Sequence, residues 1–166
     1  MRVLGIDPGI ATSGYGFLDI DGQSSRLCEC GAIITPAGMP TSRRLSEVHR
    51  QIEEVIGRSR PDAAAVEKLF FGANARTAMG VGQARGVALL ALEQAGIPIH
   101  EYTPLEVKVA VTGYGRATKR QVQEMIQALL NLEEIPRPAD AADAVAVALC
   151  HLQSAGWLEA VRQARA

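Results

Sequence analysis

The chain of 166 residues contains little cysteine and no long apolar segment. Its three cysteines, Cys28, Cys30 and Cys150, include no C-x-x-C pair, so we expect reduced, mostly buried thiols rather than a disulfide framework or a zinc site. No stretch approaches the roughly 18 uninterrupted apolar residues of a membrane span, which argues against a membrane role. Asp7 interrupts the first apolar run too early for a secretory signal, and we therefore expect a cytoplasmic protein.

The sequence also lacks an excess of either charge. With 17 basic and 18 acidic residues its formal net charge is -1, which by itself argues mildly against a nucleic-acid partner. The distribution indicates the opposite, because two stretches contain only basic charges. These charges are Lys68, Arg76 and Arg85 between Glu67 and Glu93, and Lys108, Arg116, Lys119 and Arg120 between Glu106 and Glu124.

The sequence shows no internal repeat and no low-complexity tract. Its length fits one ordinary domain, and its hydrophobic fraction of 48% and charged fraction of 21% are typical of a soluble globular protein. We expect Gly156 to end the last helix. The predicted organisation is therefore one domain over residues 1–155 and a frayed tail over residues 156–166.

What is present is a run of three strands, followed by strands that alternate with helices. Apolar runs predict strands at residues 2–7, 14–20, 27–34, 63–67 and 97–102. The Asp21-Gly22 pair is a strong hairpin signal between the second and third strands. Helical patterns occur at residues 42–58 and 74–94, after Pro104, after Thr118 and at residues 139–154. This order predicts a mixed α/β sheet covered by helices, compatible with a ribonuclease H-like fold.

Four acidic residues stand at element ends where they could act together. Asp7 closes the first strand, Glu67 closes the fourth, and Asp140 and Asp143 lie one turn apart near the start of the last helix. Each also has an ordinary explanation. Asp7 could bond nearby backbone in an Asp-Pro-Gly turn, Glu67 could be a solvated strand end, and the helical pair could compensate the helix dipole.

The combination of these acids is more specific than any one of them. A metal-dependent nuclease needs acidic oxygens from different elements that converge on two hard cations about 4 Å apart, one activating water and one stabilising the leaving oxygen. Two cations would also move the formal charge from -1 to +3, because they add four positive charges. An acidic protein could then bind phosphate.

Five segments together resemble the RuvC family of Holliday-junction resolvases, in the order of that family. The resemblance extends from about residue 2 to residue 152. The segments are I-D-P-G at 6–9, S-G-Y-G at 13–16, V-E-K-L-F-F at 66–71, G-Q-A-R-G at 82–86 and A-D-A-A-D-A at 139–144.

The resemblance implies an α/β, ribonuclease H-like fold of the retroviral-integrase superfamily, with a mixed five-stranded sheet. It implies an Mg²⁺-dependent crossover junction endodeoxyribonuclease with two ions per active site, for which Mn²⁺ is able to substitute. The metal ligands and catalytic residues would be Asp7, Glu67, Asp140 and Asp143. Four-way junction DNA would be cut by paired symmetric nicks in recombination and repair. The implied partners are a second copy of the chain and the RuvA/RuvB branch-migration complex.

Six residues are candidates for DNA contact. The family's phosphate-contacting lysines would fall on Lys108 and Lys119, and Arg116 and Arg120 belong to the same basic stretch. All four could instead be ordinary solvated side chains. Phe70 and Phe71 directly follow the acidic strand end, and the resemblance singles out Phe70 as the ring that stacks on an unpaired base. Burial of both rings is the alternative.

Two further expectations concern the product and the oligomer. No Ser, Tyr or Cys nucleophile is positioned by a base, so we predict hydrolysis that leaves a 5′-phosphate and a 3′-hydroxyl. Gly80, Gly82 and Gly86 in the 74–94 helix indicate close packing against a neighbour. Two symmetric cuts need two active sites, so this helix is a candidate dimer interface.

Three alternatives remain open at this point. Residues 7–14 resemble the phosphate loop of actin-like ATPases and sugar kinases, but the chain offers no second copy of that loop. A junction-binding protein without activity would use only the basic stretches. Another ribonuclease H-like nuclease, acting on RNA or on duplex DNA, would use the same acids.

Overall fold

The computed structural model describes residues 1–21, 24–68 and 75–164, with side chains for 1–21, 24–68 and 78–154. In this part of the chain, five strands form one sheet in the order β3-β2-β1-β4-β5. The strands are β1 (Arg2–Asp7), β2 (Thr12–Asp21), β3 (Ser24–Ile34), β4 (Ala63–Glu67) and β5 (Ile99–Tyr102). The predicted mixed five-stranded sheet is confirmed.

The register of the sheet brings the ends of three strands level. β1 runs antiparallel to β2 but parallel to β4, and β4 runs parallel to β5. Ile6 pairs with Val66, and Glu67 pairs with Tyr102. The carboxyl ends of β1, β4 and β5 therefore meet at one edge of the sheet. β2 and β3 form the predicted hairpin, although Gly22 of its turn lies outside the described residues.

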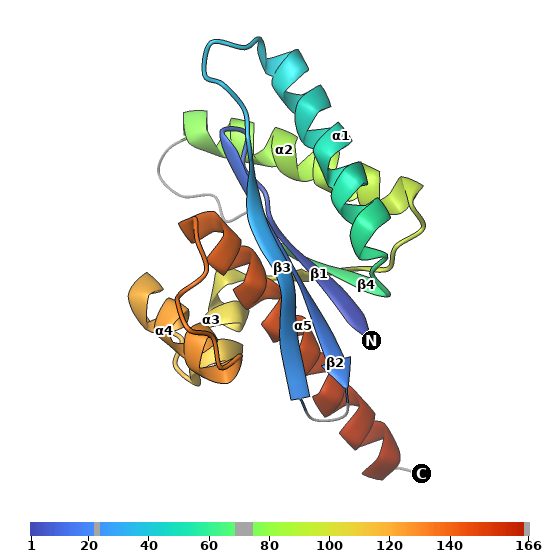
Figure 1. Ribbon diagram of the computed structural model, residues 1–166, viewed down its shortest axis with the longest axis vertical. Helices are drawn as coiled ribbons and strands as arrows, with labels where there is room; N and C mark the ends of the chain where they lie inside the picture. Colours follow the sequence, from blue (N-terminus) through green and yellow to red (C-terminus); the bar gives the residue numbers. More distant parts are fainter. Residues whose placement is uncertain (22–23, 69–74, 165–166) are drawn as a thin grey trace.

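Helices cover both faces of the sheet (Figure 1). On one face, α1 (Thr41–Ser59) and α2 (Ala75–Gln94) pack on a core that contains Leu4, Ile6 and Val66. On the other, α3 (Pro104–Thr112), α4 (Lys119–Leu129) and α5 (Ala139–Ala164) pack on a core that contains Val3 and Ala65. Because successive side chains of a strand point to opposite faces, odd-numbered residues of β1 and β4 face α5.

Two glycines allow the start of α5 to lie directly on the sheet. A Cβ at Gly5 would collide with the carbonyl oxygen of Ala144, and a Cβ at Gly14 would collide with that of Asp140. Gly14 is also the residue that pairs with Asp7. The glycines therefore place the first turn of α5 directly against the end of β1.

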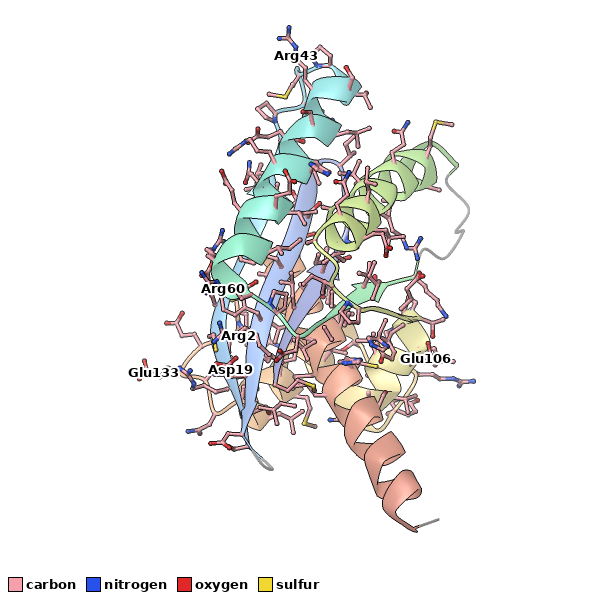
Figure 2. The ribbon with its side chains drawn as sticks, turned by 90° about the vertical axis from the view of Figure 1, so that its right-hand side faces the viewer. Arg2, Asp19, Arg43, Arg60, Glu106 and Glu133 are labelled. Atoms are coloured by element: carbon pink, nitrogen blue, oxygen red, sulfur yellow. The ribbon has the colours of Figure 1, made fainter. Side chains whose placement is uncertain are left out.

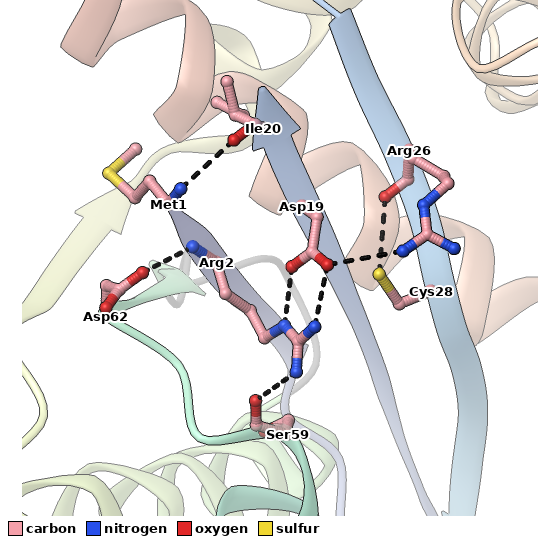
Figure 3. A network of polar contacts seen from close by, with 8 residues as sticks. All are labelled: Met1, Arg2, Asp19, Ile20, Arg26, Cys28, Ser59 and Asp62. Atoms are coloured by element: carbon pink, nitrogen blue, oxygen red, sulfur yellow. Dashed lines mark hydrogen bonds and ion pairs between the residues drawn. The ribbon is translucent and has the colours of Figure 1, made fainter. Parts of the chain in front are cut away.

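A polar network anchors the opposite end of β1 (Figure 3). The Arg2 guanidinium donates two hydrogen bonds to the Asp19 carboxylate, at 2.6 and 2.7 Å, and a third to the Ser59 carbonyl oxygen at 2.8 Å. The hydrogen bonds from Arg2 hold the pKa of Asp19 well below its ordinary value. Figure 2 shows that Arg2 and Asp19 lie toward the Arg60 end of α1, away from Arg43. The network joins β1, β2 and α1.

Several predicted boundaries were wrong. β3 begins at Ser24 rather than residue 27, and β5 begins at Ile99 rather than residue 97. The larger error is in α5, which continues through Gly156 to Ala164. A single glycine costs a helix only about 1 kcal/mol relative to alanine, so it does not end a helix that good helix formers continue.

The glycines of α2 have different surroundings. A Cβ at Gly80 would lie 3.1 Å from the Cγ2 atom of Ile10, so the predicted close packing is confirmed there. A Cβ at Gly86 would meet no described atom within 4 Å, so packing within the chain does not explain that glycine. None of the described helices is both long and apolar enough to span a membrane.

Candidate active site

Asp7 and Glu67 lie side by side at the carboxyl ends of two neighbouring parallel strands. Ile6 and Val66, which precede them, are paired across β1 and β4 and point toward α1 and α2. Alternation along the strands therefore turns both carboxylates toward α5. Both side chains line the same hollow at this edge of the sheet.

The first turn of α5 brings two more acids to the same place. The carbonyl oxygen of Pro138 accepts hydrogen bonds from the backbone N–H groups of Ala141 and Ala142, at 3.0 and 3.3 Å. Asp140 lines the hollow that contains Asp7 and Glu67. Asp143 lines an adjoining hollow that also contains Glu67. The structure thus brings the four predicted carboxylates together from β1, β4 and α5.

Burial and mutual repulsion make these carboxylates hard to ionise together. Burial, followed by the charges of Glu67, Asp143 and Asp140, raises the pKa of Asp7 to about 8. Burial and the charge of Asp143 also raise the pKa of Glu67. The pKa of Asp143 is raised by burial, against the opposing effect of Lys119. Positive charge brought to this cluster would therefore be strongly favoured.

Lys119 already supplies one positive charge. Its ammonium group donates a hydrogen bond to the Asp143 carboxylate at 2.5 Å. Burial opposes its charge, but the Asp143 partner outweighs this effect and the pKa of Lys119 is raised. The side chain of Thr118 caps α4 by accepting the Gln121 N–H at 3.2 Å, so the helix begins at Lys119 as predicted.

Lys108 of α3 and Lys119 of α4 both line the hollow that contains Glu67 and Asp143. This hollow has a volume of about 270 Å³. Lys108 and Lys119 both lower the pKa of Glu67 through their charge, which places the two ammonium groups within the electrostatic range of the acids. The wall of this hollow is formed by Glu67, Pro104, Val107, Lys108, Lys119, Val122, Asp143 and Ala146.

The donor set fits hard divalent cations. All four groups are carboxylates, which are the ligands that such ions prefer, and two of them project from one helix face. The acids are neighbours, but among the described residues no three acidic, histidine or cysteine groups are close enough to hold one ion. The Lys119 ammonium on Asp143 instead compensates part of the negative charge.

The other predicted DNA-binding residues lie outside these hollows or cannot be placed. Arg120 is mostly exposed and pairs with Glu124 one turn along α4, at 2.7 Å. Arg116 is exposed in the loop before α4. Neither arginine lines the hollows that contain the carboxylates. Phe70 and Phe71 lie outside the described residues.

Arg85 of α2 is a residue whose position at the site was not foreseen. Its Nε atom donates to the carbonyl oxygen of Glu67 at 3.3 Å, and its guanidinium pairs with the carboxylate of Glu101 on β5. Arg85 therefore supports the strand end that carries the Glu67 carboxylate, from the opposite face of the sheet. The only sequence signal was its place within a basic stretch and the G-Q-A-R-G segment.

Solved structures share this architecture over nearly the whole chain. The *Thermus thermophilus* RuvC structure matches with a TM-score of 0.88 at 39% identity, covering 95% of this chain and 96% of that one. *T. thermophilus* RuvC in complex with Holliday junction substrate also matches with a TM-score of 0.88, at 40% identity over 93% of this chain and 94% of that one. These matches confirm the predicted ribonuclease H-like fold.

Sequence comparison gives the same result. The profile described as "Crossover junction endodeoxyribonuclease RuvC" matches residues 3–151. A protein of that description from *Chloroflexus aurantiacus* is 58% identical over 159 residues, which cover 96% of this chain and 97% of the relative. The profile match extends from β1 to α5 and includes all four carboxylate positions. The chain therefore belongs to the RuvC family of crossover junction endodeoxyribonucleases.

Proposed function

We propose that this protein is an endonuclease that resolves four-way DNA junctions by paired symmetric nicks. The observation that carries the proposal is the cluster of four carboxylates from β1, β4 and α5 beside two lysines. Membership of a nuclease family implies use of a divalent metal. A relative of known structure has been solved with a Holliday junction substrate, which supports the branched substrate.

In the proposed reaction Asp7, Glu67, Asp140 and Asp143 would hold two Mg²⁺ ions, for which Mn²⁺ could substitute. Bound divalent cations supply the positive charge that activates water and stabilises the leaving oxygen. The raised pKa values of Asp7, Glu67 and Asp143 support this assignment, because acids that repel one another gain most from a divalent partner. Hydrolysis leaves a 5′-phosphate and a 3′-hydroxyl.

Lys108 and Lys119 bind the phosphate backbone in this proposal. Their hollow adjoins Glu67 and Asp143, so a phosphate held there would lie beside the acidic cluster. Lys119 must then give up its hydrogen bond to Asp143 in exchange for a phosphate oxygen. Divalent cations at the carboxylates would favour that exchange, since they replace the charge that Lys119 withdraws.

A homodimer is part of the proposal, because two symmetric cuts need two sites. α2 supports it with an outer face on which Met79 and Leu90 are 69% and 50% exposed, on either side of the exposed Gly86. Large apolar side chains on an outer helix face are typical of contact surfaces. Association with the RuvA/RuvB complex and a cytoplasmic location remain expectations from family resemblance.

The decisive experiment is a cleavage assay on a synthetic four-way junction, with linear duplex and an RNA–DNA hybrid as competing substrates. We expect symmetric nicks in the junction with Mg²⁺ or Mn²⁺, none with a chelator, and no covalent protein–DNA adduct. Preferred cutting of the duplex or hybrid would favour another ribonuclease H-like nuclease. Binding of the junction without any cutting would favour a non-catalytic protein.

Variants of the acids test the residue assignments. Asp7→Asn, Glu67→Gln, Asp140→Asn and Asp143→Asn should each abolish cutting and leave junction binding measurable, because each removes charge but little volume. Glu53→Gln, at an exposed position of α1, is the matched control and should cut normally. An acid variant that cuts at a near-normal rate would remove that residue from the metal site.

A further inference from the structure

A second hollow, lined by Asp7, Glu67 and Asp140, adjoins the one that Lys108 and Lys119 line, here called the lysine hollow. Its volume is about 520 Å³, within the range of about 300 to 1,000 Å³ that small-molecule sites occupy. It shares Glu67 with the lysine hollow, so the two hollows adjoin at that carboxylate. The rest of its wall is formed by residues 8–12, which follow β1, and by Gly80 and Val81 of α2.

The chemistry of this second hollow differs from that of the first. Among the described residues that line it, the charged groups are the carboxylates of Asp7, Glu67 and Asp140, and none is a lysine or an arginine. The described part of its wall therefore offers a phosphate no cationic side chain. The remaining wall is apolar except for backbone groups and the Thr12 hydroxyl, which can donate and accept a hydrogen bond. Such a surface suits the uncharged part of a nucleotide, the sugar and base.

The loop that forms the wall is held rigidly by hydrogen bonds from buried side chains. The Ser13 hydroxyl, 1% exposed, accepts from the Gly9 N–H at 3.1 Å and donates to the Gly9 carbonyl oxygen at 2.6 Å. The Thr35 hydroxyl, 4% exposed, donates to the Ile10 carbonyl oxygen. The Thr35 N–H donates to the Ala11 carbonyl oxygen at 3.0 Å. Three consecutive loop residues are thus held in place.

Two helices beside the loop, α1 and α2, add to this support. Arg44, in the first turn of α1, donates to the Thr35 hydroxyl at 2.8 Å and to the Ile10 carbonyl oxygen at 3.3 Å. Gly80 of α2 lies so close to Ile10 that a Cβ there would approach Cγ2 to 3.1 Å. A wall held in this way can discriminate between shapes, because it cannot move aside for a poorly fitting group.

We propose that this hollow receives the nucleoside next to the scissile phosphate, and that Ile10 and Thr12 determine which base is accepted there. The inference rests on the proposed nuclease function. A DNA strand that crosses the carboxylates would place one phosphate in the lysine hollow and the adjoining sugar and base in the second hollow, against the apolar part of its wall. Ile10 limits the size of the base by contact, and Thr12 selects among its polar edges.

The test is a set of junctions that differ only in the base next to the cut. The measurement is kcat/KM for each base, in wild type and in Ile10→Ala and Thr12→Val. Ile10→Ala removes three carbon atoms and should reduce the spread between the best and worst bases by at least about tenfold, since even one methylene group in a pocket gives discrimination of that order. Thr12→Val keeps the side-chain shape without the hydroxyl, and should change the order of preference.

Controls separate base selection from a general loss of activity. Lys119→Ala, in the lysine hollow, should slow the cutting of all four junctions about equally. The milder Ile10→Val keeps the test valid if Ile10→Ala lowers the Tm. The proposal is overturned if wild type cuts all four junctions equally, or if its preference survives in every wall variant. A wild-type protein that cuts no junction at all would remove the nuclease function itself, and the proposal with it.

Discussion

Replacing Asp7 with Asn should stabilise the metal-free protein at pH 8 while it abolishes cleavage. Asp7 is partly buried beside Glu67, Asp143 and Asp140, and both the burial and these charges disfavour its ionised form. Asparagine has nearly the same shape and no charge. The substitution therefore removes the electrostatic cost without leaving a cavity.

The expected gain in unfolding free energy follows from the pKa of Asp7, which is raised from its ordinary value of 3.8 to about 8. At about 1.4 kcal/mol per pKa unit, this difference corresponds to about 6 kcal/mol of unfolding free energy. The pKa values of Asp7, Glu67 and Asp143 are raised together, so part of this cost is shared among them, and we expect Asp7→Asn to recover about 2 to 4 kcal/mol of it.

The stabilising effect of Asp7→Asn should depend on pH. Between pH 3.8 and about 8 the folded state binds more protons at Asp7 than the unfolded state does. The contribution of this group to the unfolding free energy therefore decreases as the pH rises through that window. The advantage of Asp7→Asn should be small at pH 4 and nearly complete at pH 8.

Urea denaturation at pH 4.5, 6 and 8, with a chelator present, measures the effect. Asp21→Asn, at an exposed end of β2, is the matched control and should change the unfolding free energy little at any of these values. Adding Mg²⁺ should stabilise wild type by about 2.7 kcal/mol at one hundred times its Kd, and Asp7→Asn much less at the same concentration. An Asp7→Asn protein that is less stable than wild type at pH 8 without metal would refute the reasoning.

Three further predictions concern DNA and the dimer. Lys108→Ala and Lys119→Ala should each weaken junction binding for all sequences and reduce its salt dependence by about one charge, whereas an unchanged slope for both would exclude phosphate contacts. Leu90→Glu on the outer face of α2 should shift sedimentation from dimer to monomer, and a variant that stays dimeric would place the interface elsewhere. Phe70→Ala should cut junctions poorly but melt normally, while Phe71→Ala should lower the Tm more than the cleavage rate. A Phe70→Ala protein with a lowered Tm and a normal cleavage rate would indicate that Phe70 is a core residue.

Local interactions made many elements of this protein predictable from sequence. Thr118 and Gln121 form a reciprocal capping box at the start of α4, and Thr103 and Glu106 form another at the start of α3. A continuous apolar run closed by an acid marked β4 with its correct ends, from Ala63 to Glu67. In each case the interacting groups lie within a few residues of one another, so their spacing in the chain is enough to reveal them.

The carboxylates were found because of where they stand in their elements. An acid that ends an apolar strand, or a pair spaced by one helical turn, is visible without knowledge of the fold. Resemblance to the family then connected four positions that are far apart in the chain. The ordinary explanation of each acid could not be excluded from sequence, because the charge of one matters only when the others are near.

Only the tertiary structure decided how these groups act on one another. Lys119 and Asp143 are 24 residues apart, and their hydrogen bond depends on how α4 packs against α5. The contacts of Arg85 with Glu67 and Glu101 depend on the strand order β1-β4-β5 and on α2 crossing the opposite face. The second hollow likewise exists only where the β1–β2 loop meets α2 and α5. Sequence determined which residues can form strands, caps and metal ligands, since those properties are local, whereas pKa values and cavity walls arise from groups that only packing brings together.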